Sequence, residues 1–431
     1  MSYENFITKI LNIKPSELLS VISSSKKDGS IILKVRLKPK ECYCHICNIL
    51  GKTHGYYQRK LTHSTLVNRQ CIITYEQRRY KCPECGSTFS ERNPFIDTSE
   101  RVTYETKINV LKDLKQPENT YTSIAQKYNL STTKVTRIFD KHVNIKRKPL
   151  PMVLSIDEHY FPSSDYGTKY CCLFMNFQTG VMIDIIYDRK KNCLTDYFSS
   201  IKNETIDMRT LKPELDNVKY ISIDMYDTYR DIANIFFPKA KVCADSFHVL
   251  KHLTDDFRKI RLRLARNTED QTLKYLLIKF RSIFDHNKNI DNEPRYNKRL
   301  NRYVNLRDIR DIVFNAFEEL RAAYELKEYY IRLNAETKLE EAPRVIDEAI
   351  EYFESCGIEE YEEFYKMLTN WREEIINSFT LINGKRINNS YMESKNRVLS
   401  RLIFNANGFK NFERTRNRML YCLNPDDTFR L

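Results

Sequence analysis

The sequence predicts a multidomain α/β protein in which an N-terminal third rich in small motifs precedes a domain built on a buried sheet. Three observations lead to this prediction. Two C-x-x-C pairs lie in the first hundred residues, short apolar runs that end on aspartates follow residue 150, and a long helical pattern begins near residue 249. With 431 residues, the chain is long enough for several domains and a sizeable core.

The positive charge is concentrated in the N-terminal third. Residues 1–150 hold 27 basic and 13 acidic residues, which accounts for the whole net charge of +14. Such a local excess is typical of a protein that binds the phosphate backbone of nucleic acids, although a merely soluble basic surface has the same composition. The sequence has no apolar run of 18 residues and no secretory pattern at its start, so we expect no membrane span and a cytoplasmic location. The 12 cysteines are then expected to be thiols or metal ligands.

Residues 1–98 are expected to form a zinc-ribbon domain that binds DNA. A helix is predicted over residues 3–11, and strands over 30–37 and 71–80. Two C-x-x-C knuckles offer four thiolates for a tetrahedral structural Zn²⁺: Cys44, Cys47, Cys82 and Cys85. Their separation requires one extended hairpin; Cys42, His45 and Cys71 are alternative ligands that would break the paired geometry. Basic residues of this segment indicate contact with DNA as well: Arg59, Lys60, Arg69, Arg78 and Arg79.

Residues 99–148 are expected to form a helix-turn-helix domain. Ile124, Ala125 and Tyr128 give one helix an apolar face, Ser131 is the expected N-cap of the next, and Val135 and Ile138 pack that second helix. Its exposed side is predicted to contact DNA through Thr132, Thr133, Lys134, Thr136 and Arg137. A basic linker, residues 146–149, leads into the next domain.

Residues 149–248 are expected to form the first part of an RNase H-like domain. Strands are predicted over 152–157, 170–176 and 181–187, a helix over 194–201, and two further strands that end at Asp224 and Asp245. In the RNase H-like order the first and fourth strands are neighbours, which would bring Asp157 and Asp224 together as ligands for Mg²⁺ or Mn²⁺. Taken singly, each aspartate is equally typical of a helix cap or a turn.

Residues 249–380 are predicted to be an all-helical insertion, and 381–431 the C-terminal part of the sheet domain. The insertion begins with a basic face that either contacts DNA or is simply solvated, formed by Arg258, Lys259, Arg261, Arg263 and Arg266. A helix over residues 388–402 carries Glu393 among amides and bases, which favours a third acidic ligand over an ordinary exposed glutamate.

These motifs resemble the DDE transposases of bacterial insertion sequences, specifically the ISL-three family. The similarity includes the paired cysteine knuckles, LSIDEHYF around Asp157, YISIDMY around Asp224, DSFHVLKHL, and the closing MESKNRVLSRLIFNANGFKNFERTRNRML. Asp245 and His248 are similar to the family's (C/D)xxH signature. Ser394 departs from the glycine that family members often have after the third acid. Three nearby carboxylates are not included among the predicted metal ligands: Glu158, Asp184 and Asp227. Of these, Asp227 is the alternative to Asp224.

The resemblance implies a transposase that binds the terminal inverted repeats and catalyses metal-dependent cleavage and strand transfer with two Mg²⁺ or Mn²⁺ ions. Asp157, Asp224 and Glu393 would hold the ions, and His248 would orient the site or a phosphate. The expected partners are double-stranded DNA, both element ends and target, and further copies of the chain in a dimer or larger assembly associated with the nucleoid. A regulator that only binds DNA, or a decayed transposase, is the alternative; the three placed acids argue against both.

Overall fold

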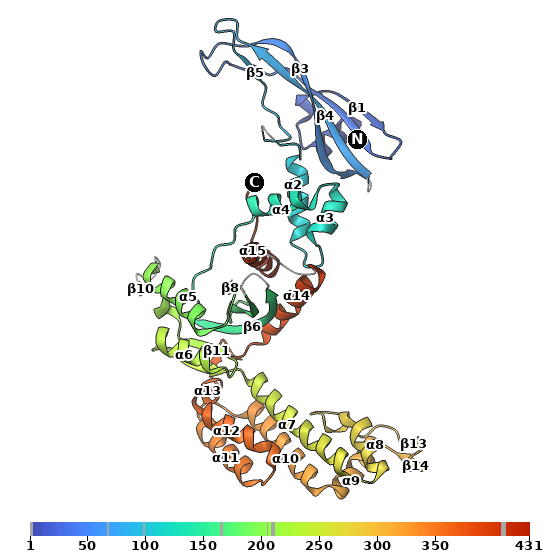
Figure 1. Cartoon of the computed structure of the whole chain (residues 1–431), viewed down its shortest axis with the longest axis vertical. Coiled ribbons are helices and arrows are strands. Elements are labelled where there is room, and N and C mark those ends of the chain that lie inside the picture. Colours follow the sequence, from blue (N-terminus) through green and yellow to red (C-terminus); the bar gives the residue numbers. More distant parts are fainter. Residues whose placement is uncertain are drawn as a thin grey trace. The chain divides into compact units, whose positions relative to one another are not determined.

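The computed structural model describes residues 3–66, 69–97, 100–163, 167–204, 206–207, 212–406 and 411–431, which form two compact units (Figure 1). The first unit comprises residues up to Lys146 and those from Arg397 onward; the second comprises most residues from Arg147 to Asn396. Part of the closing motif, residues 407–410, lies outside the described residues. None of the described helices combines the length and the apolar character that a membrane span requires.

A five-stranded sheet forms the N-terminal part of the first unit. The strand order is β1-β2-β4-β3, with β5 paired to β4, and the pairing of β2 with β4 is parallel. Leu33, Val35, Ile73 and Tyr75 alternate with more exposed residues, so one face of the sheet forms a core against α1. The elements are α1 (Tyr3–Leu11), β1 (Leu18–Ser25), β2 (Ile31–Leu37), β3 (Lys52–Leu66), β4 (Arg69–Lys81) and β5 (Thr88–Ser90).

The described helices that lie wholly in the rest of the first unit are α2 (Tyr104–Leu114), α3 (Tyr121–Tyr128), α4 (Thr132–His142) and α15 (Phe412–Leu423). The predicted helix pair is confirmed as α3 and α4, and the Ser131 side chain accepts a hydrogen bond from the backbone N–H of Lys134 at 3.2 Å. The C-terminal helix α15 packs against this helical group. The Tyr421 hydroxyl donates to the carbonyl oxygen of Leu111, and the Arg418 guanidinium donates to the carbonyl oxygens of Gln116 and Asn119. The sequence alone had placed this helix in the sheet domain.

The second unit contains a mixed five-stranded sheet of order β12-β11-β6-β7-β8, in which β6, β11 and β12 run parallel. The predicted neighbourhood of the first and fourth strands is therefore present. Its elements are β6 (Val153–Ser163), β7 (Thr168–Asn176), β8 (Met182–Ile186), α5 (Lys191–Glu204), β11 (Tyr220–Ile223), α6 (Asp227–Phe236) and β12 (Lys241–Ala244), with the short strands β9 (Ile206–Asp207) and β10 (Lys212–Pro213). In Figure 1 helices α5 and α6 lie together beside this sheet.

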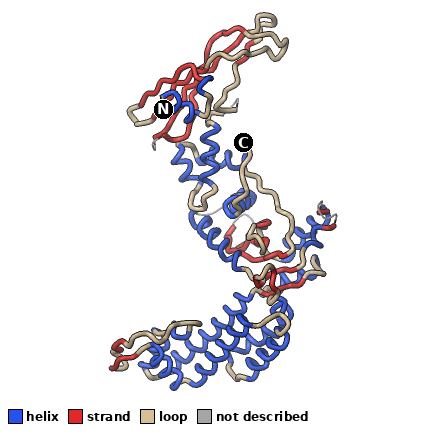
Figure 2. Tube along the Cα trace, turned by 180° about the vertical axis from the view of Figure 1, so that it is seen from behind, coloured by secondary structure: helices blue, strands red, loops and turns tan. Residues whose placement is uncertain are grey.

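A block of helices continues directly from β12 and shares one hydrophobic core with the sheet, from Leu154 to Phe379. The Asn377 amide donates to the carbonyl oxygen of Val242 on β12. The block contains α7 (Ser246–Asn267), α8 (Gln271–Lys279), α9 (Leu306–Ala316), α10 (Glu318–Glu336), α11 (Ala342–Ser355), α12 (Glu362–Asn370) and α13 (Arg372–Asn377). Figure 2 shows a small hairpin of strands β13 (Arg295–Asn297) and β14 (Arg302–Val304) at one end of these helices. The hairpin β15 (Leu381–Ile382) and β16 (Lys385–Arg386) leads into α14 (Ser390–Ala406).

Candidate active site and metal centres

Two aspartates lie level with each other just past the parallel pairing of β6 with β11. Asp224 follows the last residue of β11, whereas β6 continues beyond Asp157 to Ser163. Ser155 on β6 is in register with Ser222 on β11, so the two SID sequences run side by side and deliver Asp157 and Asp224 to one edge of the sheet. Oxygen atoms of Asp157, Asp224 and Glu158 lie within 4.8 Å of one another. Ligands collect at such an edge in open α/β sheets, and hard divalent cations prefer carboxylate oxygens. The geometry therefore fits a cation.

The electrostatics of these two aspartates also favour a cation. Burial, with the charges of Glu158 and Asp245, raises the pKa of Asp157 to about 7, although hydrogen bonds from Glu158 N–H and Asn396 oppose the shift. Burial and the charges of Glu158 and Asp157 raise the pKa of Asp224 to about 8. The buried Oδ1 of Asp224 accepts no hydrogen bond from any described residue. An unpartnered oxygen on a carboxylate that lies close to two others is the kind of atom that a divalent cation would satisfy.

Glu158 is a member of this acidic group that the sequence analysis set aside. It follows Asp157 directly, and successive side chains of a regular strand point to opposite faces, which makes such a neighbour a poor candidate on sequence alone. In the structure the Glu158 carboxylate forms an ion pair with Arg189 and accepts a hydrogen bond from the Tyr229 hydroxyl at 3.1 Å. The Arg189 guanidinium also lies over the Tyr170 and Tyr226 rings. Glu158 thus forms an ion pair with a protein cation, whereas Asp224 forms none among the described residues, although the charge of Arg189 partly opposes the rise in the pKa of Asp224.

The beginning of helix α14 is fastened to β6. Asn389 donates to the carbonyl oxygen of Ile156 at 3.4 Å, and Asn396 donates to Oδ2 of Asp157 at 2.8 Å. Glu393 lies three residues before Asn396, hence on the same side of the helix. Its carboxylate is not a member of the close group formed by Asp157, Glu158 and Asp224. The predicted role of Glu393 therefore stays a prediction, and Asn396 is a contact of Asp157 to which the sequence analysis gave no role.

Asp245 and His248 lie together at the start of α7. Asp245 is the N-cap, and its carboxylate accepts a hydrogen bond from the backbone N–H of Phe247 at 3.2 Å. The His248 Nε2 lies 4.0 Å from Oδ2 of Asp245. Burial, together with the charge of Lys251, lowers the pKa of His248, while the charges of Glu158 and Glu393 oppose that shift. The imidazole is accordingly neutral at pH 7 and lies within the electrostatic reach of the acidic group.

A second candidate metal centre is formed by the four predicted cysteines. The sulfur atoms of Cys44, Cys47, Cys82 and Cys85 lie within 4.8 Å of one another. Cys47 and Cys82 sulfurs are 3.3 Å apart, and those of Cys44 and Cys85 are 3.6 Å apart. Four sulfurs that converge from two pairs match the ligand set of a structural zinc site.

The two knuckles have the same backbone conformation, which explains why the sulfurs converge. Each pair is followed by a residue with positive φ, Asn48 at 54° and Gly86 at 69°. The N–H of each of these residues donates to the carbonyl oxygen of the first cysteine in its pair. The long hairpin β3–β4 joins the knuckles, as their spacing required. The alternative ligand Cys71 is buried in the core of the N-terminal sheet, and neither Cys42 nor His45 belongs to the sulfur group.

The residues predicted to contact DNA in the first unit differ in their exposure. Thr132, Thr133 and Arg137 are exposed on α4, and Lys134 is half-buried there. Arg79 is half-buried, with its guanidinium over the Tyr57 ring. Arg78 is a correction: its side chain is buried, forms an ion pair with Glu91 and donates to the carbonyl oxygen of Leu37. The Arg78 guanidinium is engaged by groups inside the N-terminal sheet domain, so we withdraw Arg78 as a predicted DNA contact.

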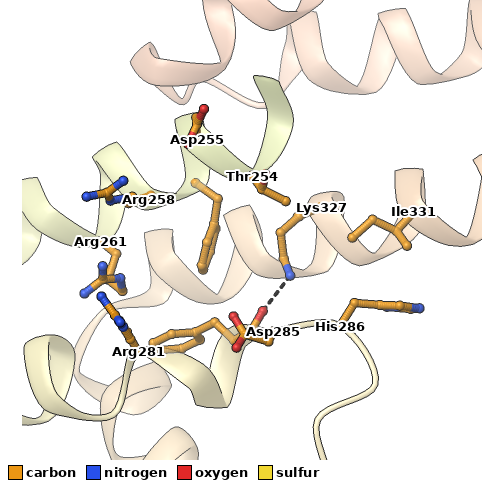
Figure 3. A pocket seen from close by; sticks show the side chains of 11 residues that line it. Thr254, Asp255, Arg258, Arg261, Arg281, Asp285, His286, Lys327 and Ile331 are labelled. Carbon is orange, nitrogen blue, oxygen red and sulfur yellow. Dashed lines mark hydrogen bonds between the residues drawn. The ribbon is translucent and has the colours of Figure 1, made fainter. Parts of the chain in front are cut away.

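The predicted basic face of α7 needs a similar correction. Arg258 is exposed, but Arg261 is buried and donates to the carbonyl oxygen of Leu277 at 2.5 Å. Figure 3 shows both residues, with Arg281, on one wall of a cavity of about 420 Å³. Arg263 forms ion pairs with Glu319 and Glu360, and Lys259 forms one with Asp256. Contacts within the helical block thus engage most of these basic side chains. Arg261 is withdrawn as a predicted DNA contact.

One comparison with known proteins places the chain in a family. The model of a family described as a transposase, of the DDE type named for ISL-three, matches residues 154–419. The matched region begins three residues before Asp157, extends through the helical block, and includes α14 with Glu393 and Asn396. No curated protein sequence matches the chain.

Proposed function

Because the chain belongs to the ISL-three family of DDE transposases, we propose that it binds the terminal inverted repeats of an insertion sequence and cleaves and rejoins DNA at the Asp157–Asp224 site. The observation that carries this proposal is the buried Oδ1 of Asp224, which has no partner among the described residues and lies beside two other carboxylates. The strand order of the sheet is the one expected of an RNase H-like catalytic domain, and it supports the same conclusion.

Asp157, Asp224 and Glu393 are the residues that we propose to hold two Mg²⁺ or Mn²⁺ ions. Two bound ions would supply an activated water or 3′-hydroxyl and would stabilise the charge that develops on the leaving oxygen. Asn396 holds Oδ2 of Asp157 in place, and its hydrogen bond favours the ionised form of that carboxylate. Arg189 neutralises Glu158, which leaves the two aspartates as the groups that need a cation.

His248 is proposed to position a DNA phosphate instead of acting as the general base. Its pKa is lowered, so the neutral ring at pH 7 has one N–H to donate and one nitrogen to accept. Its distance of 4.0 Å from Asp245 is too long for a hydrogen bond in this state of the protein, so the Asp245 carboxylate does not fix the ring. A hydrogen bond from His248 to a phosphate oxygen would suit that position.

Recognition of the element ends is assigned in this proposal to the first unit. Thr132, Thr133, Lys134 and Arg137 lie on the first turns of α4, the part of a recognition helix that enters the major groove. The zinc-ribbon sheet would add non-specific contacts through Arg79 and its basic neighbours. A dimer or larger assembly on DNA would hold two ends together for joining, and sedimentation of the protein with end duplexes measures it.

The decisive experiment combines end-labelled duplex of the element's terminus with Mg²⁺ or Mn²⁺ and the purified protein. Asp224→Asn should retain end binding and lose metal-dependent cleavage. Asp227→Asn is the matched control, because Asp227 is an exposed neighbour whose carboxylate pairs with Arg230 outside the acidic group. Equal loss in both variants would overturn the assignment of Asp224, and binding without cleavage by the unmodified protein would favour the regulator.

A further inference from the structure

The small hairpin β13–β14 presents two tyrosine rings to solvent. Tyr296 and Tyr303 are paired in register on the two strands, and their ring centroids are 5.5 Å apart. Tyr296 is 51% exposed and Tyr303 71% exposed, although aromatic side chains of this size usually contribute to a core. The rings therefore form an exposed aromatic pair on this hairpin, whose backbone lies at the end of the helical block in Figure 2.

The hairpin and the helix start that follows it are strongly basic. Residues 295–310 contain six basic residues and one acidic residue. Within the described parts of the chain, no carboxylate forms an ion pair with Arg295, Lys298, Arg299 or Arg302, and all four are exposed. This distinguishes the hairpin from helix α7, whose cations are largely engaged by Asp256, Glu319 and Glu360. Unpaired, clustered cations are the sites at which a polyanion releases its counterions on binding.

A cavity of about 570 Å³ lies at the base of the hairpin. Four cations line it, Lys279, Lys288, Arg295 and Lys298, and no carboxylate is among its lining residues, all of which the structure describes. Asparagines also line the cavity, but their side chains form hydrogen bonds with the backbone of the surrounding segments. Asn292 accepts a hydrogen bond from the Leu306 N–H, Asn297 from the Arg299 N–H, and Asn305 caps α9. The groups left to bind a ligand are therefore the cations and the tyrosine rings.

We infer that the β13–β14 hairpin and this cavity form a second DNA-binding surface, which is remote in sequence from the helix-turn-helix. This surface binds the phosphodiester backbone of duplex DNA. A two-stranded ribbon is narrow enough to enter a major groove, and cations on both of its strands then reach the flanking phosphates. The contacts are to the backbone, so the surface binds duplexes of different sequence about equally. This inference rests on the proposed function, because a transposase must hold DNA at more positions than the one it recognises.

The test measures how the full-length protein binds a fluorescent duplex of arbitrary sequence at several salt concentrations. The hairpin variant combines Arg295→Gln, Lys298→Gln and Arg302→Gln. We expect its affinity to fall at least tenfold, and the slope of log K against log salt to shrink by about 0.9 for each phosphate that is no longer neutralised, roughly 3 in all. The control variant combines Arg266→Gln, Arg332→Gln and Lys338→Gln, which removes the same charge from exposed residues of the same block that have no carboxylate partner among the described residues.

The outcomes separate the two proposals. Equal affinity and slope for the hairpin and control variants, with the unmodified protein still binding the duplex, would overturn the second surface and leave the transposase proposal intact. A selective loss of single-stranded DNA binding in the hairpin variant, with duplex binding unchanged, would also overturn it in favour of a base-stacking surface built on Tyr296 and Tyr303. If the unmodified protein binds no duplex at all, both proposals fail. Melting curves of the variants exclude loss of fold as the cause.

Discussion

The side-chain amide of Asn396 donates a 2.8 Å hydrogen bond to Oδ2 of Asp157, across 239 positions of the sequence. We expect Asn396→Ala to raise the pKa of Asp157, since this hydrogen bond favours the ionised carboxylate. The pH profile of metal-dependent cleavage should then shift to higher pH, with a loss of about 10- to 100-fold at pH 7. Asn396→Asp is the informative second variant, because it keeps the volume of the side chain and adds a negative charge beside the Asp157 carboxylate. A profile unchanged in Asn396→Ala would mean that the hydrogen bond only supports the fold.

Glu393 and Glu158 are rivals for the third metal ligand, and their glutamine variants separate them. We expect Glu393→Gln to reduce cleavage by about a thousandfold, a loss of several kcal/mol of transition-state stabilisation. Glu158→Gln should cost much less, because Arg189 already neutralises Glu158. Single-turnover rates with Mn²⁺ measure both. The opposite ranking would assign the third ligand to the close group of Asp157, Asp224 and Glu158.

The stability of the metal-free protein should fall as the pH rises from about 4 to 8. Asp157 and Asp224 have pKa values of about 7 and about 8 in the folded chain, above their usual range. Between the unfolded and folded pKa values, the native state binds more protons than the unfolded state, so each rise in pH favours unfolding by up to about 1.4 kcal/mol per unit and group. Melting of the metal-free protein at several pH values should show the decline. Mg²⁺ should reverse it at pH 8, and Asp224→Asn should flatten it; a stability that increases over this range would contradict the burial argument.

Zinc is expected at one equivalent per chain. Cys82→Ser should abolish zinc binding and destabilise the knuckle end of the N-terminal sheet, because the metal supplies folding free energy at such sites. Cys71→Ser is the control, a buried thiol outside the sulfur group. Metal analysis of both purified variants by mass spectrometry gives the answer. Zinc retained by Cys82→Ser would remove that residue from the ligand set.

Arg137 is expected to carry part of the preference for the element ends. Arg137→Gln should reduce the ratio of affinities for end duplex and scrambled duplex by about tenfold or more, since one base contact contributes about 1–3 kcal/mol of discrimination. Lys112→Gln removes the same charge from an exposed position on α2 and should lower both affinities alike or not at all. Competition binding measures the ratio, and an unchanged ratio in Arg137→Gln would place specificity elsewhere.

The positions of Asp157 and Asp224 could be predicted because the apolar pattern marks where each buried run begins and where its last apolar residue lies. The predicted end of the first strand at residue 157 was wrong, since β6 continues to Ser163. The four cysteines were predictable for a similar reason, since a C-x-x-C pair closes its own turn. The burial of Arg78 and Arg261 was not predictable, because a buried arginine and an exposed one have the same local sequence pattern. Burial is possible only because each has a partner elsewhere in the sequence, Glu91 for Arg78 and the Leu277 carbonyl for Arg261. The β13–β14 hairpin and its exposed tyrosines were missed because residues 249–380 were predicted to be all helical, and the hairpin shows that this prediction was wrong for residues 295–304.

Because Asn396 follows Asp157 by 239 positions, the hydrogen bond between them can form only late in synthesis. Both aspartates leave the ribosome well before α14, and at about 5–20 residues per second the last 170 or so residues up to Asn396 take roughly ten to thirty seconds to add. A nascent chain, or one truncated before α14, therefore carries the sheet with Asp157 unanchored. Under the proposed function, a site that needs this anchor would therefore cleave DNA only once translation is almost finished.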